Sequence, residues 1–246
     1  ITLPSGYQVL GRKPTSAPYR GRAYWFGQGS ANLMFDEDWR ASKQGILPPT
    51  QVPVLAAGAG TGITGSCRVA IAFYDEVTDE YSPISGWSNT VSLTNQNRAT
   101  TNIQATAEGR VSHVALIVEV NGGTPRIATK RQLGVTSITE NVATLALGDA
   151  FSDDFERLPM GTIGAIYHER LCVAGDAHNP DVLYVSDILE PERYGGLSFK
   201  TRNGEPIVAM APSGLAGVLL VMTPSRPYVL RGWTADDMVF EPLPYR

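Results

Sequence analysis

The chain has 246 residues, of which 43% are hydrophobic and 18% charged, a composition typical of a folded protein and not of a disordered one. Its formal net charge of −4 provides no basic field for phosphates, so nucleic-acid binding is disfavoured. No run of about 18 apolar residues is present, which excludes a membrane-spanning helix.

Residues 1–21 are rich in Gly, Pro, Ser and Arg and show no period, which predicts an extended arm or an edge segment. We expect no secretory leader here. Because the chain starts with Ile1 and not with Met, we also expect it to be a processed or partial piece. Residues 22–27 and 31–36 then form a short hairpin, and the Pro-rich residues 47–50 end this first part of the chain.

The next part, residues 52–157, predicts one antiparallel β-sandwich. Apolar side chains occupy every second position of residues 66–74 and 113–120, the period of half-buried strands. Asn121 and Gly122 accept the positive φ of a hairpin turn after the second run. Cys67 and Cys172 lie among apolar neighbours, so we expect small buried side chains in preference to a disulfide.

Residues 158–246 repeat the pattern of the first hairpin. Arg22 and Arg170 each open a short apolar strand that ends in Gly, and a second strand closed by Asp follows. Further strands at residues 205–210, 217–222 and 227–232 are typical of a β-propeller or a similar meander. The residues outside the sandwich are too few for four blades of about 40 residues each. Either the ring is incomplete, or a further segment or a neighbouring subunit completes it.

Motifs with a chemical role do not support an enzyme. Residues 60–65 spell G-x-G-x-x-G, but a strand follows where a dinucleotide site needs a helix. Residues 75–80 hold four acids without the register of a calcium loop, which favours a solvated turn. A second acidic cluster lies near the end of residues 52–157 and comprises Asp149, Asp153, Asp154 and Glu156. Neither this cluster nor the three histidines, His113, His168 and His178, have the spacing of metal ligands. We predict no catalytic, cofactor-binding or metal-binding residue, no cofactor and no enzymatic activity.

Aromatic side chains are the remaining candidates for a site. They could pack in the core, form a subunit contact or stack on sugars. The residues concerned are Tyr24, Trp25, Trp39, Trp87, Tyr194, Trp233 and Tyr245.

Residues 170–187, read as RLCVAGD…NPD…LYVSD, together with residues 70–74 and 81–85, resemble a segment common in tailed-bacteriophage structural proteins. In that family a fibronectin type III-like sandwich is joined to a β-propeller-like portion. The resemblance implies an all-β fold with the sandwich, residues 52–157, inserted between residues 1–51 and 158–246. It also implies a non-enzymatic virion component, a tail nozzle or neck connector, that forms a ring with copies of itself and contacts other virion proteins.

Two alternatives from other classes stay open. One is a carbohydrate-binding or adhesion module that uses Trp39, Trp87 or Trp233 as a platform. The other, weaker one is a propeller-type glycosidase, which would need two carboxylates about 5–10 Å apart in a cleft.

Overall fold

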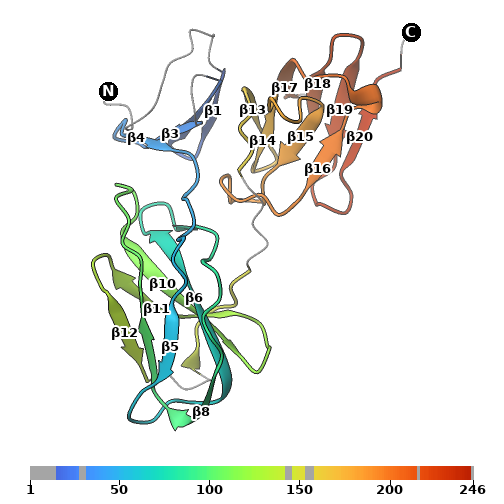
Figure 1. Ribbon diagram of the computed structural model, residues 1–246. Helices are drawn as coiled ribbons and strands as arrows, with labels where there is room; N and C mark the ends of the chain where they lie inside the picture. The colour runs from blue at the N-terminus through green and yellow to red at the C-terminus, as the bar shows by residue number, and fades with distance from the viewer. Residues whose placement is uncertain (1–14, 28–31, 142–145, 153–157, 215–216, 245–246) are drawn as a thin grey trace. The chain divides into compact units, whose positions relative to one another are not determined.

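The computed structural model describes residues 15–27, 32–141, 146–152, 158–214 and 217–244. The all-β prediction is confirmed: the chain forms five antiparallel sheets and almost no helix (Figure 1). The one helix described is the 3-10 turn η2 (Arg202–Gly204), and none of the sheets closes on itself within the described residues. The chain divides into two compact units, residues 46–153 and the described residues of 1–45 with 154–246.

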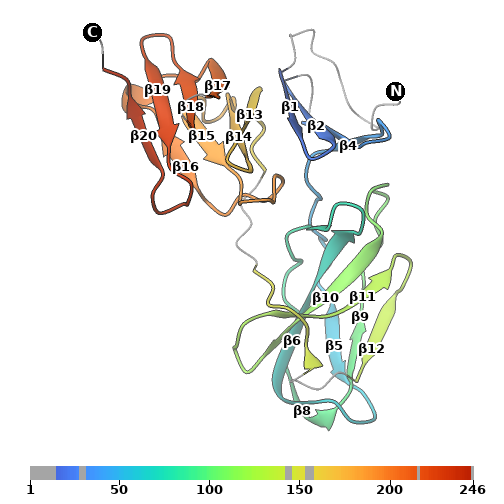
Figure 2. The same ribbon diagram turned by 180° about the vertical axis from the view of Figure 1, so that it is seen from behind.

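The unit of residues 46–153 is built from two sheets, which Figure 2 shows from behind. The larger sheet has the order β11-β10-β6-β7, with β8 also paired to β6, and the smaller has the order β12-β9-β5. The strands are β5 (Val54–Ala57), β6 (Ile63–Asp75), β7 (Glu80–Tyr81), β8 (Val91–Gln96), β9 (Arg98–Thr101), β10 (His113–Val120), β11 (Arg126–Gln132) and β12 (Ser137–Glu140).

One apolar core lies between these two sheets. The alternating residues of β6 and β10 enter it from the larger sheet, while Leu55 and Ile138 enter from the smaller. From Ala70 onward the opposite face of β6 is buried as well, since Ala70 and Ala72 have no exposed surface. The expectation of a half-buried strand is therefore wrong for this part of β6, while Ser66 at its other end is exposed. On that face the ring of Tyr74 contacts that of Tyr81, with 4.6 Å between the centroids and an angle of 37° between the ring planes.

Three serines cover the edge of β6 between β8 and β7. The backbone N–H groups of Ser82, Ser85 and Ser88 donate to the carbonyls of Phe73, Ile71 and Val69. Each serine Oγ accepts the N–H of the same strand residue at 2.9–3.0 Å and donates to the carbonyl of the residue after the serine. The edge of β6 is therefore satisfied by its own chain, which removes a site for pairing with another molecule.

The variant Ser85→Ala should lose about 1–3 kcal/mol of unfolding free energy, because the buried N–H of Ile71 loses its Oγ acceptor. Denaturation followed by circular dichroism measures the change. The matched control Ser92→Ala, at an exposed position of β8, should change stability by less than about 0.5 kcal/mol. Equal stability of Ser85→Ala and the control would contradict this role.

The second unit contains three four-stranded sheets, each a simple meander of consecutive strands. The first sheet is β1 (Thr15–Tyr19), β2 (Arg22–Phe26), β3 (Leu33–Phe35) and β4 (Ala41–Lys43). The second sheet is β13 (Ile163–Tyr167), β14 (Arg170–Ala174), β15 (Val182–Val185) and β16 (Ser198–Lys200). The third sheet is β17 (Ala209–Ser213), β18 (Val218–Met222), β19 (Pro227–Arg231) and β20 (Val239–Pro242).

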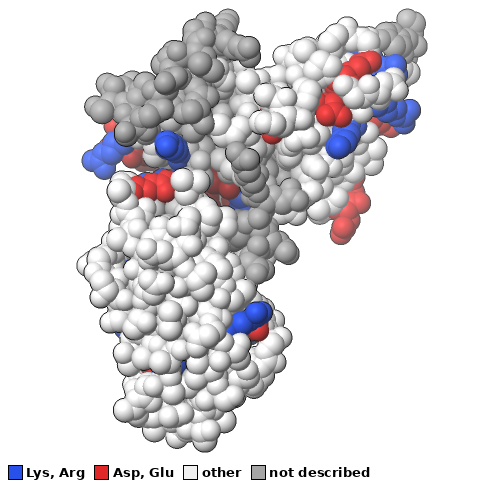
Figure 3. All heavy atoms as spheres, viewed as in Figure 1, with Lys and Arg blue, Asp and Glu red and all other residues white. Residues whose placement is uncertain are grey.

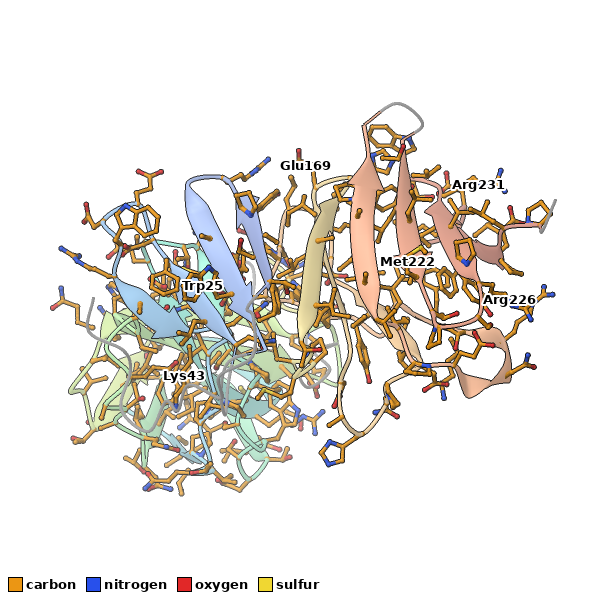
Figure 4. All side chains as sticks on the ribbon, turned by 90° about the horizontal axis from the view of Figure 1, so that it is seen from above. Trp25, Lys43, Glu169, Met222, Arg226 and Arg231 are labelled. Atoms are coloured by element: carbon orange, nitrogen blue, oxygen red, sulfur yellow. The ribbon has the colours of Figure 1, made fainter. Side chains whose placement is uncertain are left out.

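These three sheets stack in chain order, as Figure 4 shows from above. One apolar cluster joins the first sheet to the second, and another joins the second to the third. The first strands, β1, β13 and β17, are neighbours across the stack. The second sheet therefore has a neighbour on each of its faces.

Candidate functional site

The opening hairpins of the first and second sheets share one geometry. In each, five residues pair with five across a two-residue turn. A tyrosine at the end of the first strand lies opposite an arginine at the start of the second, Tyr19 with Arg22 and Tyr167 with Arg170. The turn residues have positive φ in both hairpins, as in type I′ turns. The similarity expected from the sequence thus extends to the pairing register.

The same tyrosines connect each sheet to the next one. The hydroxyl of Tyr19 donates to Glu169 in the turn of the second sheet at 2.8 Å, where Figure 4 labels that glutamate. The hydroxyl of Tyr167 lies 3.0 Å from the carbonyl oxygens of Gly217 and Gly232 in the third sheet. Burial, and then the hydrogen bond to Glu169, raises the pKa of Tyr19 to about 12. The sheets therefore repeat both in internal pairing and in their contact with the next sheet.

Gly164 allows the first two sheets to approach closely. A Cβ atom at this position of β13 would overlap the ring of Phe26, which is fully buried. The contact joins two faces that we name by direction: the forward face of a sheet points to the next sheet in the chain, and the rear face points to the preceding one. Phe26 is on the forward face of the first sheet and Gly164 on the rear face of the second.

The forward face changes from buried to exposed along the stack. Phe26 and Ala174 have no exposed surface, whereas Met222, at the equivalent position of the third sheet, is 42% exposed. The first strands show the same change, from buried Ala165 to exposed Ala211. On β17 and β18 this face carries exposed Ala209, Ala211 and Met222 with half-buried Leu220, next to buried Val229 on β19. The outer part of the same face carries the charged Arg231 and Glu241.

The rear face changes in the opposite sense. Trp25 in the first sheet is 39% exposed, while Val173 and Val221, its equivalents in the second and third sheets, have no exposed surface. Ser16, the equivalent of Gly164, is also exposed. The stack thus has two end faces. One is the rear face of the first sheet, which carries Ser16 and Trp25, and the other is the forward face of the third sheet. They are the candidate functional surfaces.

The residues considered for metal or acid–base chemistry do not converge. The Nδ1 atom of His113 lies 2.9 Å from the hydroxyl of Ser112, and the ring of His168 stacks on Trp233. His178 lies on an exposed turn beside Asp176. No group of three or more His, Cys, Asp or Glu side chains could hold a metal ion in the described part of the chain. Among the acids near the end of residues 52–157, Asp149 precedes the bridge between Ala150 and Arg126, and its carbonyl accepts the N–H of Ile127 in β11. The other three acids lie outside the described residues.

The acidic loop of residues 75–80 is not a solvated turn throughout, contrary to expectation. Asp75 is 3% exposed, and its carboxylate accepts from Arg110 Nε at 3.0 Å and from the hydroxyl of Thr78. Asp79 accepts from the hydroxyl of Tyr74. A buried arginine 35 residues away thus occupies the carboxylate that a cation would need.

The aromatic residues divide into core and surface. Tyr24 and Tyr194 are buried, and the guanidinium of Arg68 lies over the half-buried Trp87. Trp39 and Trp233 are 67% and 64% exposed, while Tyr245 lies outside the described residues. Trp39 borders a pocket of about 390 Å³, together with Arg20, Arg22, Phe35, Asp36 and Glu37. Its φ of 60° is uncommon for a bulky residue.

The thiols Cys67 and Cys172 are both buried and free, as expected. Burial raises the pKa of Cys172 to about 12, so this thiol is not a nucleophile at neutral pH. Cys67 faces the guanidinium of Arg98, a fully buried side chain that the sequence did not single out. The three guanidinium nitrogens of Arg98 have no oxygen or nitrogen hydrogen-bond partner among the described residues. The Cys67 thiol and the Glu140 carboxylate are its polar neighbours, and burial lowers its pKa.

Replacing Arg98 by methionine should therefore raise the unfolding free energy by about 1–3 kcal/mol, because it removes a buried cation that has no oxygen or nitrogen acceptor. Glu140, opposite Arg98 on β12, keeps its ion pair with Arg131 at 3.1 Å. Urea unfolding of the variant measures the change, with Arg131→Met as the control that should lower stability. Destabilisation by Arg98→Met would contradict the prediction.

Comparison with protein-family models and with curated proteins finds no match to this chain. Within the described residues, no helix has both the length and the apolar character needed to cross a bilayer. Most of the surface of residues 46–153 that faces the viewer in Figure 3 belongs to neither acidic nor basic side chains. The two end faces of the three-sheet stack remain the candidate functional surfaces.

Proposed function

We propose that this protein is a non-enzymatic structural component of a bacteriophage tail, a nozzle or neck connector, which forms a ring with copies of itself and contacts other virion proteins. The observation that carries the proposal is the exposure of Ala211 and Met222 on the forward face of the third sheet, at positions where the first and second sheets are buried. Exposed apolar faces of this kind mark interaction surfaces. The resemblance of residues 170–187 to tailed-phage structural proteins supports the same class.

In this interpretation the three four-stranded sheets are consecutive blades of a β-propeller, and residues 46–153 are an inserted sandwich of the fibronectin type III kind. The simple meander within each sheet and the adjacent first strands support blades. Two sheets around one core support the sandwich. Because propellers contain four to eight blades, three blades need others to close the ring.

Negative-stain electron microscopy of the purified chain tests the assembly. We expect annular particles with rotational symmetry at micromolar concentration, since closed rings bury faces that one copy leaves exposed. The variant Val77→Lys, at an 84% exposed turn position of the other unit, should form the same particles. Fields that contain only single chains at every concentration would refute the proposal.

The pocket beside Trp39 favours a second candidate function, carbohydrate binding. An exposed indole next to two guanidinium groups and two carboxylates combines a stacking surface with hydrogen-bonding groups. A glycan array tests it: Trp39→Ala should abolish binding, while Trp233→Ala, outside the pocket, should preserve it. Absence of binding by the unaltered chain would eliminate this candidate.

A further inference from the structure

We propose that the forward face of the third sheet packs against the rear face of the first sheet of a second copy of this chain. The inference rests on the proposed ring assembly and names the two surfaces that would form it. It is a head-to-tail contact, because each copy contributes a different face.

The first argument is that the chain already contains this type of interface twice. The forward face of the first sheet packs on the rear face of the second, and the forward face of the second packs on the rear face of the third. Each interface joins equivalent faces in the same order. A third interface of this type needs a forward face and a rear face that are both exposed, and the described residues provide one of each, marked by Met222 and Trp25. Figure 4 labels both residues, on the third and first sheets respectively.

The second argument is a residue-level match. In the interface between the first two sheets, Phe26 on the forward face lies against Gly164 on the rear face. The equivalents of these residues at the two ends of the stack are Met222 and Ser16. Both end residues are exposed. The pairing pattern within the chain therefore predicts that Met222 of one copy lies against Ser16 of the next.

Both faces also have a composition that fits a sheet-to-sheet contact. The forward face of the third sheet presents a row of small and aliphatic side chains, while its ion pair between Arg231 and Glu241 lies on the outer two strands. On the rear face of the first sheet, Phe35 contacts Trp25 edge-on at 5.2 Å between centroids. Tryptophan, phenylalanine and methionine side chains are enriched at protein interfaces, and Trp25, Phe35 and Met222 supply them here.

Two copies joined in this way place the three described sheets of one copy directly after the three described sheets of the other. A head-to-tail contact that closes on itself forms a ring and leaves neither end face exposed. We therefore expect the head-to-tail contact to link copies into a closed ring.

Cysteine cross-linking between two different variants tests this contact. Ser16→Cys and Met222→Cys are prepared separately, and the native thiols do not interfere because both are buried. Under mild oxidation, or with a short bismaleimide, the equimolar mixture should give a covalent dimer, whereas each variant alone should not. A dimer from either variant alone indicates a face paired with itself and overturns the proposal.

A charge variant gives the matching measurement without cross-linking. Met222→Lys should shift the assembly midpoint at least tenfold to higher concentration, because it places an ammonium group in a closed apolar interface. Val77→Lys, the same change at an 84% exposed position, should leave the midpoint unchanged. If particles form but the mixed cysteine variants do not cross-link, the ring role survives and this interface is wrong. If no particles form at all, both are wrong.

Discussion

Replacing Arg110 by methionine is expected to lower the unfolding free energy of residues 46–153 by about 3–5 kcal/mol, because it leaves a carboxylate buried without its cation. The side chains of Arg110 and Asp75 are 6% and 4% exposed and lie 3.0 Å apart. Arg110 also donates to the hydroxyl of Thr78, so the loss extends over a small network. Guanidinium unfolding followed by circular dichroism measures the change, and amide hydrogen exchange in β6 and β10 assigns it to this unit.

Two controls separate the buried pair from a general effect of losing an arginine. Arg40→Met removes the exposed pair with Asp38, whose side chains are 78% and 72% exposed, and should change stability by less than about 1 kcal/mol. The double variant Arg110→Met with Asp75→Leu should recover most of the loss, since it removes both buried charges. An Arg110→Met variant as stable as Arg40→Met would contradict the assignment.

The contact between Phe26 and Gly164 should show the second large effect. Phe26→Ala is expected to cost about 3–5 kcal/mol, as for other fully buried phenylalanines. Gly164→Ala should cost about 1–3 kcal/mol, because the added methyl group overlaps the Phe26 ring. In the double variant the methyl group occupies space that the ring has left.

A double-mutant cycle measures that compensation. We expect a favourable coupling of about 0.5–3 kcal/mol between the two substitutions, as for residues in direct contact. The control is Gly109→Ala, at a glycine where an added Cβ meets no atom within 4 Å, which should show no coupling to Phe26→Ala. Additive effects of Phe26→Ala and Gly164→Ala would mean that the first two sheets do not meet at this point.

Sequence patterns predicted the strands well where a strict alternation marks them, as along β6 and β10. One feature was missed because its period is not that of a strand or a helix. Ser82, Ser85 and Ser88 recur every third residue along an irregular segment, yet they pair with every second residue of β6. The sequence contains the pattern S-x-x-S-x-x-S, but the role of these serines is evident only when the segment is placed beside the edge of β6.

The candidate surfaces could not be located from the sequence either. In each of the three sheets both faces carry apolar side chains, so no pattern distinguishes a covered face from an exposed one. Only the stacking shows that Met222 is exposed where Phe26 and Ala174 are buried. The edge of β6 is covered by its own chain, whereas the exposed Met222 and Trp25 lie on faces of sheets.

The mass of the unaltered chain in solution, measured by sedimentation equilibrium over a range of concentrations, tests the central claim of assembly most directly. The account predicts species of at least twice the 26.5 kDa of one chain, with their fraction rising with concentration. A constant mass of 26.5 kDa up to the highest concentration would contradict it.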